Sequence, residues 1–234
     1  MGPMIRLATG DDATGILAIY APIVRETAVS FEVTPPDVNQ MRERIANTLG
    51  RFPWLVCADA EQILGYAYAS AHRDRAAYQW SVDVSVYVDA RARRAGVGRS
   101  LYTSLLSLVE LQGFYNAYAG ITLPNPASVA LHEAVGFRLV GIYRSVGYKL
   151  GKWHDVGWWH RGVRAPRVPP DPPVEFAKIR DTPACERAVV SGLRFFGLST
   201  DVNTPALPRP AARREWASAR QDVRGLAALT FQTG

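Results

Sequence analysis

A strand, a basic glycine-containing turn and a helix follow one another in the middle of the chain, and this succession constrains the fold more than any other feature. Residues 82–88 alternate and are rich in β-branched side chains, which predicts a half-buried strand. Residues 100–109 carry apolar side chains at helical spacing. The turn between them, residues 93–98, lets backbone N–H groups approach an anion at the positive end of the helix. The succession therefore predicts a phosphate or pyrophosphate site.

The turn does not match two better-known phosphate-binding patterns. It is not followed by Gly-Lys-Ser/Thr, as in a P-loop, and it lacks the three ordered glycines of a dinucleotide fingerprint. Its spacing, Arg-x-x-Gly-x-Gly after a strand, resembles the loop that binds the coenzyme A pyrophosphate in the GNAT N-acetyltransferase superfamily. On these six residues alone, a helix start with an incidental basic turn is an equally good explanation.

Length and composition place the chain among globular proteins. It has 234 residues, enough for one full domain and an appendage, and 48% of them are hydrophobic. No apolar run is long enough for a membrane span and no apolar signal region opens the chain, so we expect a cytoplasmic protein without membrane contacts. The two cysteines form no metal or redox pattern, which predicts a buried Cys57 and an incidental Cys185.

The positive charge is concentrated in the last third of the chain. Of the net charge of +6, residues 1–163 carry +2 (16 basic and 14 acidic residues) and residues 164–234 carry +4 (11 and 7). A basic balance suits an anionic cofactor. Because most of the excess lies outside the region of the glycine turn, it does not indicate a nucleic-acid partner.

Hydrophobic periodicity and capping residues predict an alternation of strands and helices up to about residue 163. Residues 29–33 fit either a loop or a short strand. The expected helices cover residues 13–24, 34–49, 100–109 and 126–136, and the expected strands cover 5–8, 54–58, 63–69, 82–88, 118–123, 137–146 and 153–160.

The composition changes at about residue 165. Residues 164–176 form a proline-rich linker, which predicts an extended, semi-rigid connection. Residues 177–234 show no strand pattern, and only residues 180–196 and 213–229 could form marginal helices. We expect this extension to be disordered or loosely docked, because so short a segment buries little surface. Out-of-frame or read-through translation of a shorter gene is an alternative explanation.

Residues 4–163 resemble the phosphinothricin acetyltransferase family, a GNAT branch that acetylates the α-amino group of phosphinothricin and of methionine sulfoximine or sulfone. The resemblance covers about two thirds of the chain, in register, through separated segments. These segments are residues 29–31, 52–56, 77–80, 84–88, 98–102, 131–137 and 147–156.

The resemblance implies an α/β (α+β) GNAT acyl-CoA N-acyltransferase fold for residues 1–163. This fold has a mixed central sheet of about seven strands flanked by helices, here followed by a C-terminal tail. The resemblance also implies acetyl-CoA as the acetyl donor, no metal, a small-molecule amine as acceptor, direct transfer in a ternary complex, and a homodimer.

The resemblance further assigns residues to the coenzyme. Two valines at the end of the strand would align the pantetheine arm, and the turn with the start of the helix would hold the pyrophosphate. The amide of an asparagine that also caps a helix would meet the pantetheine arm. The implied coenzyme-binding residues are Val86, Val88, Arg93, Arg94, Gly96, Val97, Gly98, Arg99, Asn125 and Ser128.

For proton removal from the amine, the resemblance implies Asp83 and His132. The family pattern has Glu at position 83, so the carboxylate arm here is one methylene shorter and a direct contact could become water-mediated. A near-neutral pKa suits histidine to proton transfer. Without the resemblance, Asp83 would be read as a surface carboxylate and His132 as a solvated helix residue.

The resemblance also implies an acceptor pocket with Phe31, Arg73, Arg75 and Tyr78, in which either arginine could clamp a carboxylate or phosphinate. A solvated loop over residues 72–75 is the alternative. Two other functions keep the same fold: acetylation of a polyamine, an aminoglycoside or a protein N-terminus, and a non-catalytic acyl-CoA-binding module. Polyamines would prefer acidic walls to arginines.

Overall fold

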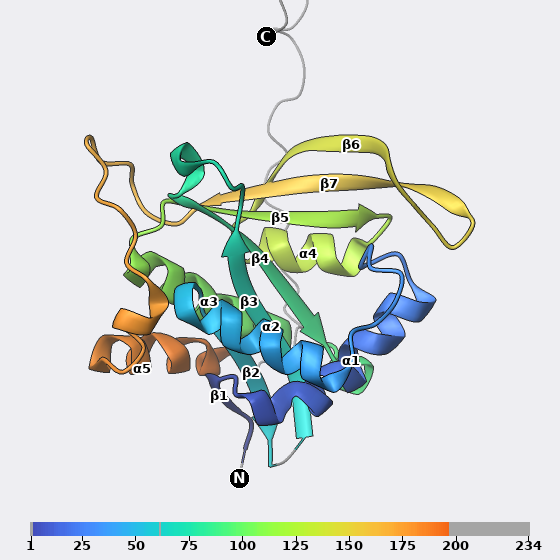
Figure 1. Ribbon diagram of the computed structural model, residues 1–234, viewed down its shortest axis with the longest axis horizontal. Coiled ribbons are helices and arrows are strands. Elements are labelled where there is room, and N and C mark those ends of the chain that lie inside the picture. Colours follow the sequence, from blue (N-terminus) through green and yellow to red (C-terminus); the bar gives the residue numbers. More distant parts are fainter. Residues whose placement is uncertain (1, 61, 197–234) are drawn as a thin grey trace, which may run out of the picture. The chain divides into compact units, whose positions relative to one another are not determined.

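The computed structural model describes residues 2–60 and 62–196, and they form a seven-stranded mixed sheet in the order β1-β2-β3-β4-β5-β7-β6. Every neighbouring pair is antiparallel except β4 and β5, which are parallel. The expected GNAT architecture is thereby confirmed (Figure 1). The strands are β1 (Met4–Leu7), β2 (Trp54–Asp59), β3 (Gln62–Ala71), β4 (Ser81–Val88), β5 (Asn116–Leu123), β6 (Arg138–Lys149) and β7 (Lys152–Gly162).

Helices cover both faces of the sheet. A Cβ added at Gly65 of β3 would touch Val97 and Leu101, so α3 lies on that face. The next residue, Tyr66, points the opposite way and stacks on Tyr87, which in turn meets Tyr20 of α1. The helices are α1 (Ala13–Glu26), α2 (Val38–Arg51), α3 (Val97–Gln112), α4 (Pro126–Ala134) and α5 (Pro183–Val190), with short 3₁₀ turns η1 (Gly10–Asp12), η2 (Ala76–Tyr78), η3 (Ala90–Ala92), η4 (Phe176–Lys178) and η5 (Ser191–Phe195).

The two parallel strands separate soon after they meet. Three residues of β4, from Ser81 to Asp83, pair with β5, and the last of these pairs is Asp83 with Tyr118. Beyond it β5 continues along β7, whereas β4 continues along β3 alone (Figure 1). The backbone of Val84–Val88 is therefore open on the side facing β5, and Asp83 lies where the strands part.

Helix α2 begins later than the sequence pattern predicted. Asp37 is its N-cap, because Asp37 Oδ1 accepts a hydrogen bond from the Gln40 N–H at 2.8 Å and Gln40 Oε1 accepts one from the Asp37 N–H at 2.9 Å. The helix starts at Val38, so residues 34–36 precede it instead of forming its first turn. Residues 29–33 form a loop and not a strand.

Hydrogen bonds from Trp80 and Gln112 attach the proline-rich linker to the domain. Trp80 Nε1 donates a hydrogen bond to the carbonyl of Asp171 at 2.9 Å. The Gln112 side chain, which is buried, donates to the carbonyl of Val174 at 2.8 Å, and the Val174 N–H donates back to the carbonyl of Gln112 at 2.8 Å. Extended backbone with few internal hydrogen bonds leaves such groups free to bond elsewhere.

The prediction of a loosely docked or disordered extension is wrong for residues 177–196. Phe176 and Cys185 are buried in the main hydrophobic core, so Cys185 is not an incidental surface residue. Ser104 Oγ of α3 donates to the carbonyl of Val189 at 2.6 Å and accepts from the Gly192 N–H at 3.1 Å. Small side chains on this face of α3 admit the extension closely, which periodicity within the extension could not reveal. The predicted helix over 213–229 lies outside the described residues.

No helix within residues 2–60 and 62–196 has the length and apolar character needed to cross a membrane.

Candidate active site

A carboxylate and an imidazole are hydrogen-bonded where β4 and β5 part. The side chain of Asp83 points away from the buried Val82 and Val84, and its Oδ1 lies 2.7 Å from Nδ1 of His72. Their side chains are 27% and 12% exposed, respectively, so neither is a free surface group. The reading of Asp83 as a surface carboxylate is therefore wrong.

Sequence reasoning missed His72 because it treated residues 72–75 as one loop. The register of β3 and β4 contains the missing signal: Ser70 is opposite Asp83, and His72 lies two residues further along the same face. Side chains at such diagonal positions are within reach when one of them is long.

Burial and charge act on Asp83 in opposite directions. Desolvation raises the pKa of its carboxyl, and the hydrogen bond to His72 with the nearby charge of Arg73 offsets only part of that rise. The carboxylate is thus more basic than a solvated aspartate, which makes it a stronger hydrogen-bond acceptor toward the imidazole.

The ring of His72 is held by aromatic side chains. It stacks on Tyr118 of β5 with ring centroids 4.4 Å apart and an interplanar angle of 16°. Tyr78 and Trp158 approach its edge or face at 5.9 and 6.2 Å in near-perpendicular arrangements. These contacts restrict the rotation of the imidazole, so the direction of its free nitrogen is set by packing.

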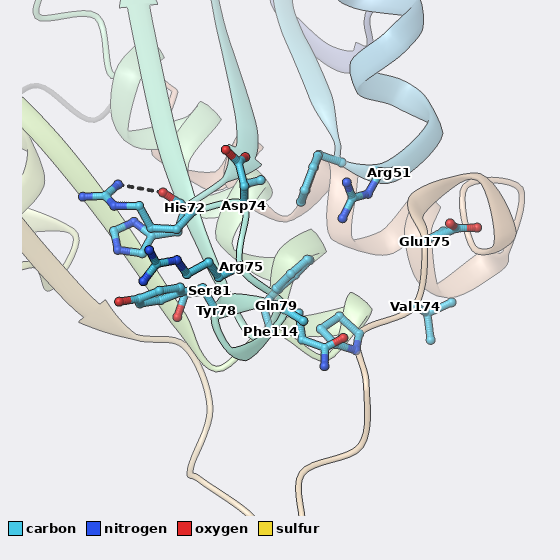
Figure 2. A pocket seen from close by; sticks show the side chains of 15 residues that line it. Arg51, His72, Asp74, Arg75, Tyr78, Gln79, Ser81, Phe114, Val174 and Glu175 are labelled. Carbon is cyan, nitrogen blue, oxygen red and sulfur yellow. Dashed lines mark hydrogen bonds between the residues drawn. The ribbon is translucent and has the colours of Figure 1, made fainter. Parts of the chain in front are cut away.

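A cavity of about 370 Å³ lies beside His72, and three of the four predicted acceptor residues line it. Figure 2 shows the side chains of His72, Arg75 and Tyr78 next to one another at one side of this cavity. Arg73 also lines it; its guanidinium lies 5.5 Å from the ring centroid of Trp158 and donates to the carbonyl of His72 at 2.7 Å. Among the lining residues, three arginines (Arg51, Arg73 and Arg75) outnumber two carboxylates (Asp74 and Glu175), so the cavity wall is basic overall and carries aromatic rings.

Phe31 does not belong to this cavity. Its ring rests where a Cβ on Gly147 would be, and it lies 6.2 Å from the imidazole of His154. The structure thus places the predicted acceptor residues in two separate groups.

His132 is buried, contrary to the alternative of a solvated helix residue, and only 4% of it is exposed. Its Nδ1 is 2.7 Å from the carbonyl of Ser128, which can only accept, so Nδ1 carries the proton. Nε2 then accepts from the hydroxyl of Tyr102 at 2.7 Å. Burial lowers the pKa of His132, and the ring is therefore neutral with both nitrogens engaged. A direct base role for His132 stays a prediction, and it would require Nε2 to exchange Tyr102 for the amine.

The glycine turn has the geometry of an anion site. Arg94 and Gly96 have φ of +64° and +84°, in the left-handed region, and Gly96 is the N-cap of α3 without a side-chain capping bond. The first N–H groups of α3, from Val97 onward, therefore have no intrahelical acceptor and can bind an anion. A Cβ on Gly98 would be 2.9 Å from a terminal methyl carbon of Leu131 on α4, so glycine allows this approach of the two helices without a shift of the Leu131 side chain.

The predicted coenzyme residues differ in what they can contribute. The side chains of Arg93 and Arg94 are exposed beside the turn, whereas Val97 is buried and could contribute only its backbone. The guanidinium of Arg99 lies 4.1 Å from the ring centroid of Phe195 in the C-terminal segment, a neighbour that sequence reasoning did not anticipate.

The remaining coenzyme residues lie on β4 and at the start of α4. Val86 and Val88 are half-buried on the part of β4 that has left β5. Asn125 is the N-cap of α4, with its Oδ1 accepting from the Ser128 N–H at 3.1 Å, which leaves the amide NH₂ free to donate elsewhere. Within the described residues, no three His, Cys, Asp or Glu side chains are grouped as metal ligands would be.

Comparison with known proteins gives consistent matches to one enzyme class. Residues 5–158 match the model of the acetyltransferase (GNAT) domain. The chain is 40% identical over 168 residues to a phosphinothricin N-acetyltransferase from Streptomyces viridochromogenes, covering 72% of this chain and 91% of that protein. It is 34% identical to an L-methionine sulfoximine/L-methionine sulfone acetyltransferase from Pseudomonas paraeruginosa, covering 73% of this chain and all of the relative.

Among solved structures, the chain is similar to a GNAT superfamily phosphinothricin acetyltransferase from Sinorhizobium meliloti in complex with AcCoA. The TM-score is 0.68 at 33% identity, covering 75% of this chain and 99% of the other.

Proposed function

The chain belongs to the GNAT acetyltransferase family, and from this premise we propose that it acetylates the α-amino group of a small amino acid or amino-acid analogue. Acetyl-CoA is the donor, as in GNAT acetyltransferases generally. Phosphinothricin, methionine sulfone and methionine sulfoximine are the proposed acceptors, because relatives at 34–40% identity are named for them.

One observation carries the proposal: a basic, aromatic cavity adjoins the hydrogen-bonded Asp83 and His72 where β4 leaves β5. An amino acid brings a carboxylate and an ammonium group. Arg73 and Arg75 are suited to the carboxylate, because a guanidinium binds it through two parallel hydrogen bonds. The ammonium group would then lie toward the groups that can take its proton.

The glycine turn supports the donor side of the proposal. The free N–H groups of α3 and the exposed Arg93 and Arg94 suit a pyrophosphate. The unpaired edge of β4 at Val86 and Val88 offers backbone hydrogen bonds to the amides of a pantetheine arm. Donor and acceptor would meet beside Asp83, which supports direct transfer in a ternary complex.

The chemistry requires one proton transfer and one displacement. The acceptor ammonium loses a proton, the neutral amine attacks the thioester carbonyl carbon, and a C–N bond forms. The C–S bond then breaks, and the coenzyme leaves as a thiolate that takes up a proton. The chain must supply a base, hold both substrates and stabilise the oxyanion.

Thiol release measured with acetyl-CoA and each of the three acceptors tests the proposal. Arg75→Gln should raise the KM for the acceptor at least tenfold and leave the KM for acetyl-CoA unchanged, because a bidentate charge-assisted contact is lost. Arg25→Gln on α1 is the matched control and should change neither constant. No turnover with any small amino acid or analogue would contradict the proposed substrate class.

The two alternatives, acetylation of another class of amine and a non-catalytic acyl-CoA-binding module, can be distinguished from the proposed function. The arginines in the cavity wall disfavour polyamines and aminoglycosides, which are cations. Asp83→Ala should abolish most turnover and keep acetyl-CoA binding if the chain is an enzyme of this kind. A non-catalytic acyl-CoA-binding module would bind acetyl-CoA and turn over no amine in either form.

We propose in addition that residues 1–163 form the catalytic domain and that two copies associate through β6 and β7. Toward one end, these strands and the turn that joins them expose five large apolar side chains, namely Tyr143, Val146, Tyr148, Leu150 and Trp153. Exposed apolar clusters of this kind are typical of interfaces. A cytoplasmic location is proposed because the acetyl donor is a metabolite of the cell interior.

A further inference from the structure

We propose that His72 is the base that takes the proton from the acceptor amine, and that Asp83 acts through it by orienting the imidazole and stabilising its protonated form. This inference rests on the proposed function and assigns a residue that the family resemblance did not supply. The geometry of the pair, its position relative to the cavity and the state of the other candidate histidine support it.

The hydrogen bond between the two side chains determines the tautomer of His72. An ionised carboxylate can only accept, so Nδ1 carries the proton in the 2.7 Å contact with Asp83 Oδ1. In the neutral ring, Nε2 is then the nitrogen that carries the lone pair. No hydrogen bond joins Nε2 to any residue within 2–60 or 62–196, so its lone pair is available to a substrate.

The position of the ring places it between the carboxylate and the acceptor cavity. His72 lines the cavity together with Arg73, Arg75 and Tyr78, whereas Asp83 is not among the lining residues. An amine held in the cavity therefore meets the imidazole before it meets the carboxylate. A nitrogen base within hydrogen-bond reach of the ammonium group is the geometric requirement for general base catalysis.

The shorter carboxylate at position 83 is consistent with His72 as the base and Asp83 as the residue that orients it. The resemblance predicted Glu at that position, and Asp83 is one methylene shorter. The imidazole extends the reach of the carboxylate toward the cavity, so a direct carboxylate–amine contact is not needed. Stacking on Tyr118 and the contacts with Tyr78 and Trp158 hold the ring in line.

The other predicted base is engaged elsewhere. Both ring nitrogens of His132 already have partners, Ser128 and Tyr102, and burial lowers its pKa. Of the two histidines, only His72 combines a free nitrogen with a place in the cavity wall. His132 instead connects α4 to α3 through Tyr102.

The charged and titratable groups around His72 come from its own loop and from four further elements. Arg73 and Asp74 follow it in the same loop and are joined by Arg75, and Tyr78 belongs to η2. Asp83 approaches from β4. Tyr118 of β5 and, beyond it, His160 of β7 complete the group, with ring centroids of the last two 4.9 Å apart. Asp83 stabilises the imidazolium, and Arg73 opposes it.

The proposed step balances in protons and charge. Nε2 of His72 takes one proton from the acceptor ammonium, which yields a neutral amine and an imidazolium paired with the Asp83 carboxylate. The amine nitrogen then attacks the thioester carbon while the ring holds the proton. The imidazolium afterwards releases the proton to the departing thiolate or to water, and the ring returns to its neutral tautomer.

His72→Phe tests the assignment, because phenylalanine keeps a flat ring against Tyr118 and removes the base. We expect kcat/KM for the acceptor to fall about 10²-fold at pH 7, with acetyl-CoA binding unchanged. Activity should recover as the pH rises toward the pKa of the free amine. Asp83→Asn should also lower kcat/KM, and the double variant should lose no more than the worse single variant, because the two residues act as a unit.

His160→Gln is the matched control. His160 lies against the same Tyr118 ring, but its Nε2 bonds to Asn116 and not to a carboxylate. The pH profile of kcat/KM for the His160→Gln variant should have the same shape as that of the wild type. The inference would be overturned if His72→Phe kept the wild-type kcat/KM and the acidic limb of its pH profile. It would also be overturned if the losses of the two single variants multiplied in the double variant.

A readout without an acceptor separates this inference from the proposed function. Nitrogen-15 NMR of the histidine rings should show His72 as the Nδ1–H tautomer in the wild type and a changed tautomer population in Asp83→Asn. If the wild type turns over none of the three acceptors but shows this tautomer, the proposed function is wrong and the assigned His72–Asp83 hydrogen bond is supported. Turnover together with an Nε2–H tautomer of His72 would contradict the role of His72 as a base oriented by Asp83 and would leave the proposed function intact.

Discussion

At the scale of single residues, His72 and His132 show how one residue type acquires two different chemical roles. His72 has one nitrogen bonded to a carboxylate and the other free beside a cavity. His132 has both nitrogens bonded inside the protein, so it acts as a neutral connector. The family resemblance implied His132 and not His72, and the residues adjacent to a histidine in sequence do not reveal its partners in space.

The lowered pKa of His132 predicts a pH-dependent contribution to stability. The folded ring binds a proton less readily than the unfolded ring, whose pKa is about 6.5. The free energy of unfolding should therefore fall as the pH drops through and below 6.5. His132→Gln lacks this titration and loses the paired hydrogen bonds, so it should be less stable than the wild type by about 1–3 kcal/mol at pH 8.

The difference in the free energy of unfolding between the wild type and His132→Gln should narrow toward pH 5, where protonation of His132 destabilises the wild type. Urea denaturation at pH 5, 6, 7 and 8 measures it. Burial lowers the pKa of His160 as well, but His160 is present in both proteins, so its effect cancels in the comparison. A difference that stays constant with pH would contradict the lowered pKa of His132 in the folded protein.

At the scale of elements, α3 serves two different neighbours. Its N-terminus after Gly96 presents free N–H groups, and its serine-bearing face receives the C-terminal segment. Ser100 and Ser104 of that face are buried. The same helix therefore links the proposed coenzyme site to a segment that lies outside the family match, which ends at residue 158.

The close approach of η5 to α3 predicts a large effect of a small substitution. A Cβ at Gly192 would overlap the backbone carbonyl of Ser100 and crowd Ser104 Oγ. Because backbone cannot move aside as a flexible side chain can, Gly192→Ala should destabilise the protein by about 1–3 kcal/mol. Thermal unfolding followed by circular dichroism measures this loss.

Gly50→Ala is the control for that experiment. Gly50 lies in α2, and nothing is within 4 Å of a Cβ placed there. Alanine should be neutral or stabilise the helix by up to about 1 kcal/mol. Equal melting temperatures for the Gly192→Ala variant and the wild type would show that η5 does not pack against α3 in solution.

At the scale of the whole molecule, the exposed apolar side chains of β6 and β7 predict self-association. Trp153 is 63% exposed next to Tyr148, with ring centroids 5.3 Å apart. A charge at this position would have to be desolvated in an interface, so Trp153→Glu should dissociate the proposed dimer. Light scattering after size-exclusion chromatography should give the mass of two chains for the wild type and of one for the variant.

Val168→Glu is the matched control, because Val168 is also an exposed apolar residue but lies in the linker, away from β6 and β7. It should leave the mass unchanged. A wild-type mass of one chain would contradict the proposed association, and a variant that unfolds by circular dichroism would be replaced by Trp153→Ser for the same measurement.

The sequence by itself determined the order and type of the elements and the glycine turn. Strand and helix periods, the Asn125 cap and the glycine turn over residues 93–98 depend on contiguous residues, so local rules were sufficient. The resemblance added the architecture and the enzyme class, because matching segments kept their order along two thirds of the chain.

Only the tertiary structure decided which side chains meet. The bond between His72 and Asp83 spans 11 positions, and the bond between Ser104 and Val189 spans 85. Such partners depend on the register of β3 with β4, on where β4 leaves β5, and on which helix face stays open to a returning segment. None of these is a property of neighbouring residues, and for this reason the base and the docking of the C-terminal segment became visible only in the fold.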